Sequence, residues 1–560
     1  MNLPEKLNQL PKKVNSAILL ILLVAIVSVI VYYRVKVQLE IGPMWDTYDF
    51  LSNALLFAGK GSGYSDLNRP PLLPFLTSIF FRFGEVTEVT IFALDGVFAV
   101  FGVIGFYLFL KLRFSESISF LGALLFATFP ITLIFSGAGL TDIPSVSLSI
   151  WALYFTVLAV KKNSKFFYVS FLFVVLAFLT RYVAALIIFP VLFYMLTNKK
   201  CFANLKDIIL GILISFLPVL PVLLFFNYVY GNALYSFKSF FTTTGVKGLT
   251  GSFFYQPDMF FYIKHFFSYI GPGGFAIISI ILLGVMFYFV GGKYSLKKEF
   301  KRNISKLSMN NGKIEISILL ILVLIFIFSF SKVQFSVSEI IFFLICVMSY
   351  HLLKKLEMQF MDLNFLFLLW FMTFFIFHSI YTIKDDRYFV TMAAPVAYFL
   401  VLGFNNISSR LKYKIKNIEI SKILILVIIL LLLTFTASYV PNILKENVLS
   451  REKVEYTSSA SNWLREYDPD YENKIIYADY SAYFGWYLKM KVIPMPFFDN
   501  GKPQYYQPKE YNANELSIIY NNELKKNNVD YYLSNKQGLN LTDYKILKQF
   551  GFITIYKRRS

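Results

Sequence analysis

Long apolar stretches recur along most of this chain, and short polar or charged segments separate them. A helix that crosses the hydrocarbon core of a bilayer needs about 20 predominantly apolar residues, and with that ruler we count about thirteen spans. The predicted spans are residues 17–38, 90–111, 117–136, 143–160, 165–180, 182–197, 206–228, 272–291, 315–331, 336–353, 363–382, 388–404 and 421–439. The pattern therefore predicts a polytopic α-helical membrane protein.

The positive charges of the intervening segments fall on one side of the predicted bundle. Lysine and arginine gather in the loops on the same side as the N-terminus, for instance at residues 161–165 and 410–416. Because such residues concentrate in cytoplasmic loops, the N-terminus is predicted to be cytoplasmic. The extracytoplasmic side then receives residues 39–89, 136–142, 229–271, 384–387 and 441–560.

Residues 441–560 differ from the rest, because they are polar, rich in Tyr, Asn and Lys, and contain no span. Residues 461–465 are predicted to be helical, and short runs at 474–478, 529–533 and 552–556 predict strands between turns. We therefore expect a transmembrane domain at 1–440, with outer loops at 39–89 and 229–271, and a small extracytoplasmic α/β domain at 441–560.

The composition agrees with a membrane protein and narrows the partners. Hydrophobic residues make up 57% of the 560 residues, whereas a soluble protein averages nearer half. The net charge of +20 would suit nucleic acid, but the lysines cluster between apolar runs, so we expect membrane lipids and no nucleic acid as partners. The two cysteines give no disulfide framework, and the three scattered histidines predict no histidine-built metal site.

Two carboxylates, Asp46 and Asp49, follow the first predicted span. Asp46 could act as a general base or electrostatic partner at the water–lipid boundary, where a reduced dielectric strengthens its field. It could also simply cap the helix that follows, which Gly59 to Gly63 would end. Asp49, one helical turn further on, would face the same way or belong to a solvated surface.

Arg69 comes shortly afterwards, directly before Pro70 and Pro71. The prolines stiffen the backbone, so Arg69 is predicted to project from a rigid segment. A guanidinium fork suits a pair of phosphate oxygens. The alternative is an arginine that reaches the lipid headgroups.

Three further charged residues fall on the same predicted face. Asp142 opens a span after a glycine-containing turn, either as a helix cap or as a second acidic wall of one outer cavity. Arg181 lies between two spans with almost no loop, where a charge is costly and usually has a partner or a role. Arg387 either pairs with the neighbouring Asp385 or Asp386 or belongs to the same site. The convergence of these charges on one membrane face indicates a functional site.

The order of these motifs resembles that of the GT-C membrane glycosyltransferases. Within them it is similar to the branch of dolichyl-phosphate-mannose protein mannosyltransferases and aminoarabinose (lipid A) transferases. The resemblance covers nearly the whole chain and is most specific in the membrane part. The motifs that carry it are Trp45-Asp46, Arg69-Pro70-Pro71-Leu72, Gly139-Leu140-Thr141-Asp142, Thr180-Arg181 and Asp386-Arg387-Tyr388-Phe389 with Pro395.

The resemblance implies roles for the charged residues. Asp46 matches the acidic position of the first loop and would activate or orient the acceptor, and Asp142 matches the second acidic position. Arg69 would hold the carrier phosphate, and Arg181 and Arg387 would neutralise the charge on the departing phosphate.

Two positions depart from the family pattern. Thr47 stands where relatives often have an acidic residue, so Asp49 could take that place as a third catalytic candidate. Asp95 stands where relatives often have an arginine.

The resemblance further implies an inverting transferase. The abundance of Lys, Asn and Ile with few Ala indicates an AT-rich prokaryotic genome, so the plasma membrane of a prokaryotic cell is the expected location. Its donor would be a hexose or pentose on a polyprenyl (dolichyl or undecaprenyl) phosphate, and its acceptor an extracytoplasmic protein, glycan or lipid. No cofactor is firmly implied, and a divalent metal ion is left open. The alternatives are an oligosaccharyltransferase-like enzyme, a transporter or flippase, and a non-catalytic protein on the same scaffold.

Overall fold

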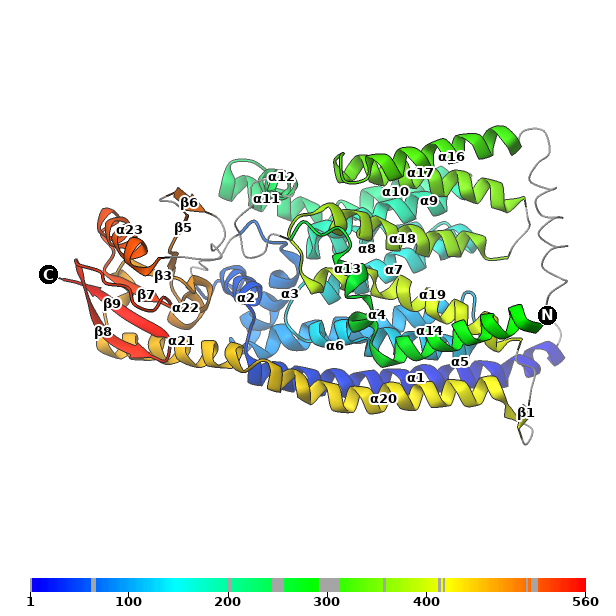
Figure 1. Cartoon of the computed structure of the whole chain (residues 1–560), viewed down its shortest axis with the longest axis horizontal. Coiled ribbons are helices and arrows are strands. Elements are labelled where there is room, and N and C mark those ends of the chain that lie inside the picture. The colour runs from blue at the N-terminus through cyan, green and yellow to red at the C-terminus, as the bar shows by residue number, and fades with distance from the viewer. Residues whose placement is uncertain are drawn as a thin grey trace.

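The computed structural model describes residues 3–61, 67–198, 204–243, 256–291, 312–355, 359–410, 414–415, 418–499, 502–504 and 512–559. The molecule is elongated, with a bundle of long helices at one end and a smaller domain with a β-sheet at the other (Figure 1). Each predicted span coincides with helix over most of its length. The prediction of a polytopic helical protein with a small C-terminal sheet domain is therefore confirmed.

The bundle is built from helices of very different lengths. They are α1 Leu3–Ile41, α2 Trp45–Ala58, α3 Leu72–Phe83, α4 Val89–Leu110, α5 Glu116–Thr128, α6 Pro130–Phe135, α7 Asp142–Lys161, α8 Phe166–Thr180, η1 Tyr182–Ile187, α9 Ile188–Thr197, α10 Leu205–Ser215, α11 Val219–Tyr230, α12 Tyr235–Thr243, α13 Phe261–Lys264, α14 Phe266–Gly291, α16 Gly312–Ser329, α17 Phe335–Lys354, α18 Met361–Ile380, η3 Asp386–Phe389, α19 Val390–Ser408 and α20 Ile420–Glu446. Two short strands, β1 Lys414–Ile415 and β2 Ile418–Glu419, precede α20.

In the described part of the chain, 9 helical segments are long and apolar enough to cross a membrane. They lie in α1, α4, α7, α10–α11, α13–α14, α17, α18, η3–α19 and α20. Shorter apolar helices accompany them, namely α3, α5, α8, η1–α9 and α16. The chain is thus an integral membrane protein, while the count of about thirteen spans and the orientation stay predictions.

Proline and glycine interrupt the helical backbone at two places that pack together. The span predicted at 117–136 divides into α5 and α6, and α6 begins at Pro130, where the missing proline N–H leaves no intrahelical bond unmade. In α14 the backbone of Gly271 has φ 61°, a left-handed conformation that glycine adopts without strain. A Cβ atom on Gly271 would lie 2.8 Å from the Pro130 ring, so the two breaks pack against each other.

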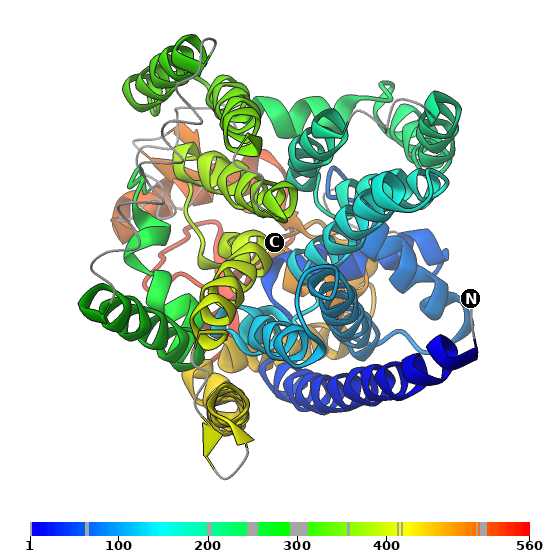
Figure 2. The same cartoon turned by 90° about the vertical axis from the view of Figure 1, so that its right-hand side faces the viewer.

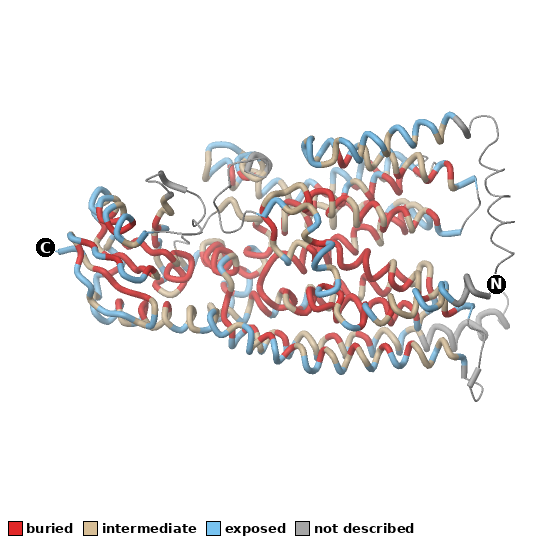
Figure 3. The backbone as a smooth tube through the Cα atoms, in the orientation of Figure 1, coloured by how far each residue is buried: buried red, intermediate tan, exposed pale blue. Residues whose placement is uncertain are grey.

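The most buried backbone lies at the centre of the bundle (Figure 3). Viewed along the bundle, α16 and α20 lie at its outside (Figure 2). The side chains that α16 and α20 leave exposed include many large apolar ones, such as Leu324, Ile327 and Leu426. Exposed leucine and isoleucine on long apolar helices are expected where lipid covers the protein.

The C-terminal domain has a five-stranded mixed sheet of order β4-β3-β7-β9-β8. Strand β3 is parallel to β4 and β7, and β9 is antiparallel to β7 and β8. The strands predicted near 474–478, 529–533 and 552–556 correspond to β3, β7 and β9. The elements are α21 Val448–Tyr467, η4 Tyr471–Asn473, β3 Ile476–Ala478, α22 Ser481–Leu488, β4 Ile493–Pro494, β5 Phe497–Asp499, β6 Lys502–Gln504, α23 Ala513–Lys526, β7 Tyr531–Ser534, β8 Tyr544–Phe550 and β9 Ile553–Arg558.

Helix α22 fastens this domain onto the bundle. The ring of Tyr483 lies 4.3 Å from that of Tyr48 in α2, and the Tyr48 and Tyr487 hydroxyls are 2.8 Å apart. The ring of Trp486 stacks on Phe81 of α3 at 6.3 Å. The predicted outer loop 39–89 is therefore largely two helices, α2 and α3, between the bundle and the sheet domain (Figure 1).

Candidate active site

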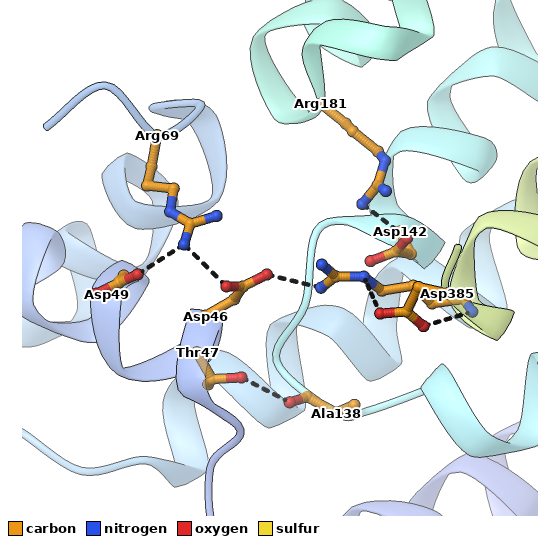
Figure 4. Close-up of polar contacts among 9 residues, drawn as sticks. Asp46, Thr47, Asp49, Arg69, Ala138, Asp142, Arg181 and Asp385 are labelled. Atoms are coloured by element: carbon orange, nitrogen blue, oxygen red, sulfur yellow. Dashed lines mark hydrogen bonds and ion pairs between the residues drawn. The ribbon is translucent and has the colours of Figure 1, made fainter. Parts of the chain in front are cut away.

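The six predicted site residues lie close together at the end of the bundle that faces the sheet domain. Arg69 lies beside Asp46 and Asp49, and Arg181 lies beside Asp142 (Figure 4). They come from separate elements along the chain, namely α2, the segment before α3, α7, the α8–η1 junction and η3.

Asp46 is the second residue of α2, and its carboxylate joins two arginines. Its Oδ1 accepts a hydrogen bond from Arg69 Nη2 at 2.9 Å, and its Oδ2 accepts one from Arg387 Nη1 at 2.6 Å. The residue before α2 is Met44, and no side chain caps that helix end. The alternative that Asp46 caps the helix is therefore wrong, whereas Gly59 does end the helix, with φ 71°. Gly63 lies outside the described residues.

Asp49 faces the same way as Asp46, as the helical spacing predicts. Its Oδ2 accepts from the same Arg69 Nη2 at 2.9 Å, and the residue is 5% exposed. The alternative of a solvated surface for Asp49 is therefore wrong. Arg69 turns toward two carboxylates, so the alternative in which it reaches the lipid headgroups is wrong as well.

The backbone around Arg69 is held from two directions. Pro71 directly precedes α3 and fixes where that helix starts. On the other side of Arg69, the backbone oxygen of Asn68 accepts from the Tyr182 hydroxyl at 3.1 Å, and its side-chain oxygen accepts from Ser236 at 3.1 Å. The guanidinium thus projects from a segment that is anchored to α12 and η1.

Arg387 combines the two roles that the sequence left open. Its Nη1 reaches Asp46, and its Nε lies 3.1 Å from Asp385 Oδ2. The other neighbour, Asp386, accepts instead from the Tyr269 hydroxyl at 2.6 Å. Arg387 therefore links the first outer segment to η3, across more than 300 residues of sequence.

Asp142 and Arg181 form the second ion pair of the site. Asp142 is the first residue of α7, and Thr141 before it makes no side-chain cap. The Asp142 carboxylate makes no cap hydrogen bond either and lies 2.7 Å from Arg181 Nη1, with side-chain exposures of 1% and 13%. The capping alternative for Asp142 is therefore wrong. The expected second acidic wall stands beside Asp385 (Figure 4), and Arg387 is close enough to interact with it electrostatically.

The electrostatics of the site depend on these arginines. Burial by itself would raise the pKa of Asp46, but the Arg69 and Arg387 guanidinium groups outweigh burial and hold the pKa of this carboxyl well below its ordinary range. Asp46 is consequently ionised throughout the physiological pH range, and both of its oxygens are engaged.

Two residues that sequence reasoning missed organise the η3 side. The ring of Tyr388 lies under both guanidinium groups, 5.3 Å from Arg181 and 5.6 Å from Arg387. Its position directly after Arg387 was the available signal. Lys384 is buried and donates to the backbone oxygens of His378 and Ser379 at 2.6 and 2.8 Å, so it closes the end of α18. Burial lowers the pKa of Lys384 to about 8.

The donor set does not assemble a ready metal site. Within the described ranges, no group of three or more His, Cys, Asp or Glu side chains is placed to hold a metal ion. The two oxygens of Asp46 already face guanidinium groups, which a metal ion would have to displace. The assistance of a divalent ion stays a prediction.

Known proteins resemble this chain in part of its sequence and in its fold. A family model described as dolichyl-phosphate-mannose-protein mannosyltransferase matches residues 68–225, a segment that contains Arg69, Asp142 and Arg181. Among curated proteins, none matches the sequence of this chain.

Two solved structures share the architecture. ArnT from Cupriavidus metallidurans, bound to undecaprenyl phosphate, superposes with a TM-score of 0.57 at 11% identity, over 96% of this chain and 97% of that one. The archaeal oligosaccharyltransferase AglB from Archaeoglobus fulgidus, in complex with an inhibitory peptide and a dolichol-phosphate, gives a TM-score of 0.50 at 16% identity, over 91% and 69%. At these identities the likeness establishes the fold, and the resemblance to the GT-C glycosyltransferases is confirmed at that level.

Proposed function

We propose that this chain is a membrane glycosyltransferase. It moves a sugar from a polyprenyl-phosphate carrier to an acceptor hydroxyl on the extracytoplasmic side, with inversion at the anomeric carbon. The observation that carries the proposal is the Asp46 carboxylate held between Arg69 and Arg387. A base for the acceptor and cations for a leaving phosphate are the groups that this reaction needs. The family match and the ArnT-like fold support the same reaction class.

In the proposed step the acceptor oxygen attacks the anomeric carbon while the bond from that carbon to the carrier phosphate breaks. The acceptor proton passes to a carboxylate, for which Asp46 is the first candidate. The carrier keeps the electron pair as a phosphate dianion, and Arg69, Arg181 and Arg387 are the cations available to stabilise it. Asp142 holds Arg181 in place through their ion pair.

The contacts of Asp46 add a condition to this mechanism. With both oxygens bound to guanidinium groups, Asp46 is a weak base. A carrier phosphate that draws Arg69 or Arg387 toward itself would free an oxygen of Asp46 and raise its basicity. The arginines would therefore couple binding of the donor to activation of the acceptor.

The oligosaccharyltransferase alternative differs in its donor, which would be a lipid-linked oligosaccharide instead of a monosaccharide. The transporter alternative differs in the place of its ionisable groups, since transporters bind near the bilayer midplane. The charges of the present site lie at one end of the bundle, beside the sheet domain (Figure 1). This placement favours an enzyme that works at the membrane surface.

The test is sugar release in nanodiscs with radiolabelled polyprenyl-phosphate hexoses and pentoses. We expect wild-type protein to release or transfer label and Asp46→Asn to lose this activity at unchanged folding. The matched control is Asp258→Asn, because Asp258 is an outer-side carboxylate in an exposed pair with Lys264 at 2.6 Å. Equal turnover by wild type and Asp46→Asn would remove Asp46 from the mechanism. Turnover only with lipid-linked oligosaccharide would favour the oligosaccharyltransferase.

A further inference from the structure

Two ionisable side chains outside the site lie fully inside the bundle. Arg34 of α1 is 1% exposed and Asp95 of α4 is 0% exposed, and both belong to helices long and apolar enough to span a membrane. A charged group at such a depth is costly to insert, so it is retained where it has a partner or a role. Both side chains reach one segment of the chain, residues 133–139.

Arg34 holds the end of α6. Its Nε donates to the backbone oxygen of Leu133 at 2.9 Å, and its Nη2 donates to that of Ile134 at 2.6 Å. The last carbonyl groups of a helix have no partner within the helix, and the arginine fork satisfies two of them at once. The side chain of Gln38 accepts from the same Nη2 at 2.7 Å.

Asp95 holds the turn that follows. Its Oδ2 accepts from the backbone N–H of Gly139 at 2.9 Å. Gly137 and Gly139 have φ of 73° and 74°, so the turn uses a conformation that other residues rarely adopt. A Cβ atom on Gly139 would lie 2.8 Å from Thr47 Cγ2. The backbone of the turn therefore packs closely against α2.

The same turn is connected to two of the site carboxylates, Asp46 and Asp142, through the residues next to them in sequence. The Thr47 hydroxyl, next to Asp46, donates to the backbone oxygen of Ala138 at 3.2 Å (Figure 4). At its other end the turn leads directly into Asp142, the first residue of α7. The position of this turn therefore fixes Asp142 relative to Asp46.

We propose that Asp95, supported by Arg34, is a positioning residue that holds the 136–141 turn and thereby sets the spacing of the Asp46 and Asp142 carboxylates. Asp95 acts by accepting from the backbone of the turn, at Gly139 and Leu140, which requires an acceptor oxygen and no charge. The inference rests on the proposed function for its kinetic readout only.

The experiment compares Asp95→Leu, Asp95→Asn and wild type in nanodiscs. Leucine removes the acceptor oxygen at similar volume, whereas asparagine keeps one. We expect Asp95→Leu to speed hydrogen exchange in peptides covering residues 136–142 and to lower kcat about 100-fold, since small misplacements of reacting groups have effects of this size. The KM for the carrier should change little, and Asp95→Asn should behave like wild type in both measurements.

Thr156→Val is the matched control, because Thr156 also makes a buried side-chain hydrogen bond in α7, to Ser170 at 2.7 Å, but far along the helix from Asp142. It should leave exchange at 136–142 and kcat unchanged. If Asp95→Leu is not recovered folded, Thr47→Val replaces it, with the same pattern at a smaller amplitude.

Unchanged exchange and kcat in Asp95→Leu would overturn the proposal, as would an Asp95→Asn variant as impaired as Asp95→Leu. A wild-type protein without turnover would count against the proposed function alone. In that case the exchange arm still decides whether Asp95 holds the turn.

Discussion

The two ends of α7 carry ion pairs of different design. At its first residue Asp142 pairs with Arg181 at 2.7 Å, and the side chains are 1% and 13% exposed. At its last residue Lys161 pairs with Asp362 at 2.9 Å, and the side chains are 40% and 15% exposed. The first pair has a further guanidinium and carboxylate near it, those of Arg387 and Asp385, which pair at 3.1 Å. Figure 4 shows Asp385 next to Asp142.

The Lys161–Asp362 pair joins two helices, whereas the Asp142–Arg181 pair belongs to the cluster of charges that we propose as the active site. A surface pair contributes about 0–1 kcal/mol. The Lys161–Asp362 pair, with a half-exposed lysine and a hydrogen bond from Tyr194 to Asp362, is explained by joining α7 to α9 and α18. Burying charges carries a desolvation cost that can exceed their attraction. Stability alone is therefore a weak explanation for the cluster around Asp46 and Asp142, and the proposed phosphate leaving group would account for it. The following predictions test this contrast.

The largest effect is expected at the two ends of α7 themselves. Asp142→Asn should lower sugar transfer about 1,000-fold, because a charge that the chemistry uses is lost and Arg181 loses its buried partner. Asp362→Asn should leave transfer within the error of the assay. Both are measured as kcat/KM in nanodiscs, with thermal unfolding as the folding check. A loss of similar size in Asp362→Asn would erase the distinction between the two pairs.

A smaller effect is expected from Arg387→Lys. A lysine keeps the charge, but a single ammonium group cannot reach both Asp46 and Asp385 as the guanidinium does. We expect kcat/KM to fall about 100-fold. Lys161→Arg, the reverse exchange at the other end of the bundle, should have no effect. Full activity in Arg387→Lys would show that charge alone suffices.

Acidification should reduce the stability that the Asp46 ion pairs contribute to the folded protein. The pKa of Asp46 is lower in the folded protein than in the unfolded chain. Its contribution to stability is therefore complete above the unfolded value of about 4 and is lost as the pH falls through the folded value, by on the order of 2 kcal/mol. The free energy of unfolding in detergent should be constant from pH 8 to about 5 and should decrease at lower pH. Asp46→Asn should show a shallower decline, and identical pH profiles would contradict this.

The smallest effect is expected at the contact between the sheet domain and α2, which lies at the same end of the bundle as Asp142. The Tyr48 and Tyr487 hydroxyls are 2.8 Å apart, so Tyr48→Phe and Tyr487→Phe should be coupled by about 1 kcal/mol. Chemical unfolding of both single variants and the double variant measures this coupling. Additive effects would show that this hydrogen bond contributes nothing to docking.

Much of the fold could be predicted because a span is a local property. Hydrophobic length alone located the helices, since a helix in lipid satisfies its own backbone hydrogen bonds. The break at Pro130 was harder, because the run 117–136 remains apolar across it, whereas Gly271 falls directly before the predicted span 272–291. Likewise α3 was predicted as loop, since Arg69-Pro70-Pro71 signals a turn and the 12-residue helix after it is too short to register as a span.

The candidate site could be predicted as a set of residues but not as a set of contacts. Asp46, Asp49, Arg69, Asp142, Arg181 and Arg387 were found from charge at membrane boundaries and from the family resemblance. Their partners were not, because Asp46 and Arg387 lie 341 residues apart in sequence. Asp95 was noted only as a departure from a pattern, since its hydrogen bond to Gly139 involves a backbone N–H that every residue except proline carries.

The sequence by itself determined that the chain is a membrane protein, which segments are helical and which charges are unusual, because hydrophobic length and charge burial act locally. Only the tertiary structure decided that Asp46 is held between two arginines and that Asp142 pairs with Arg181 instead of capping. It also decided that Asp95 binds the turn before Asp142 and that Arg34 binds the end of α6 next to it. These contacts depend on where helices meet in three dimensions. The packing of the helices determines these contacts, and local sequence preferences do not.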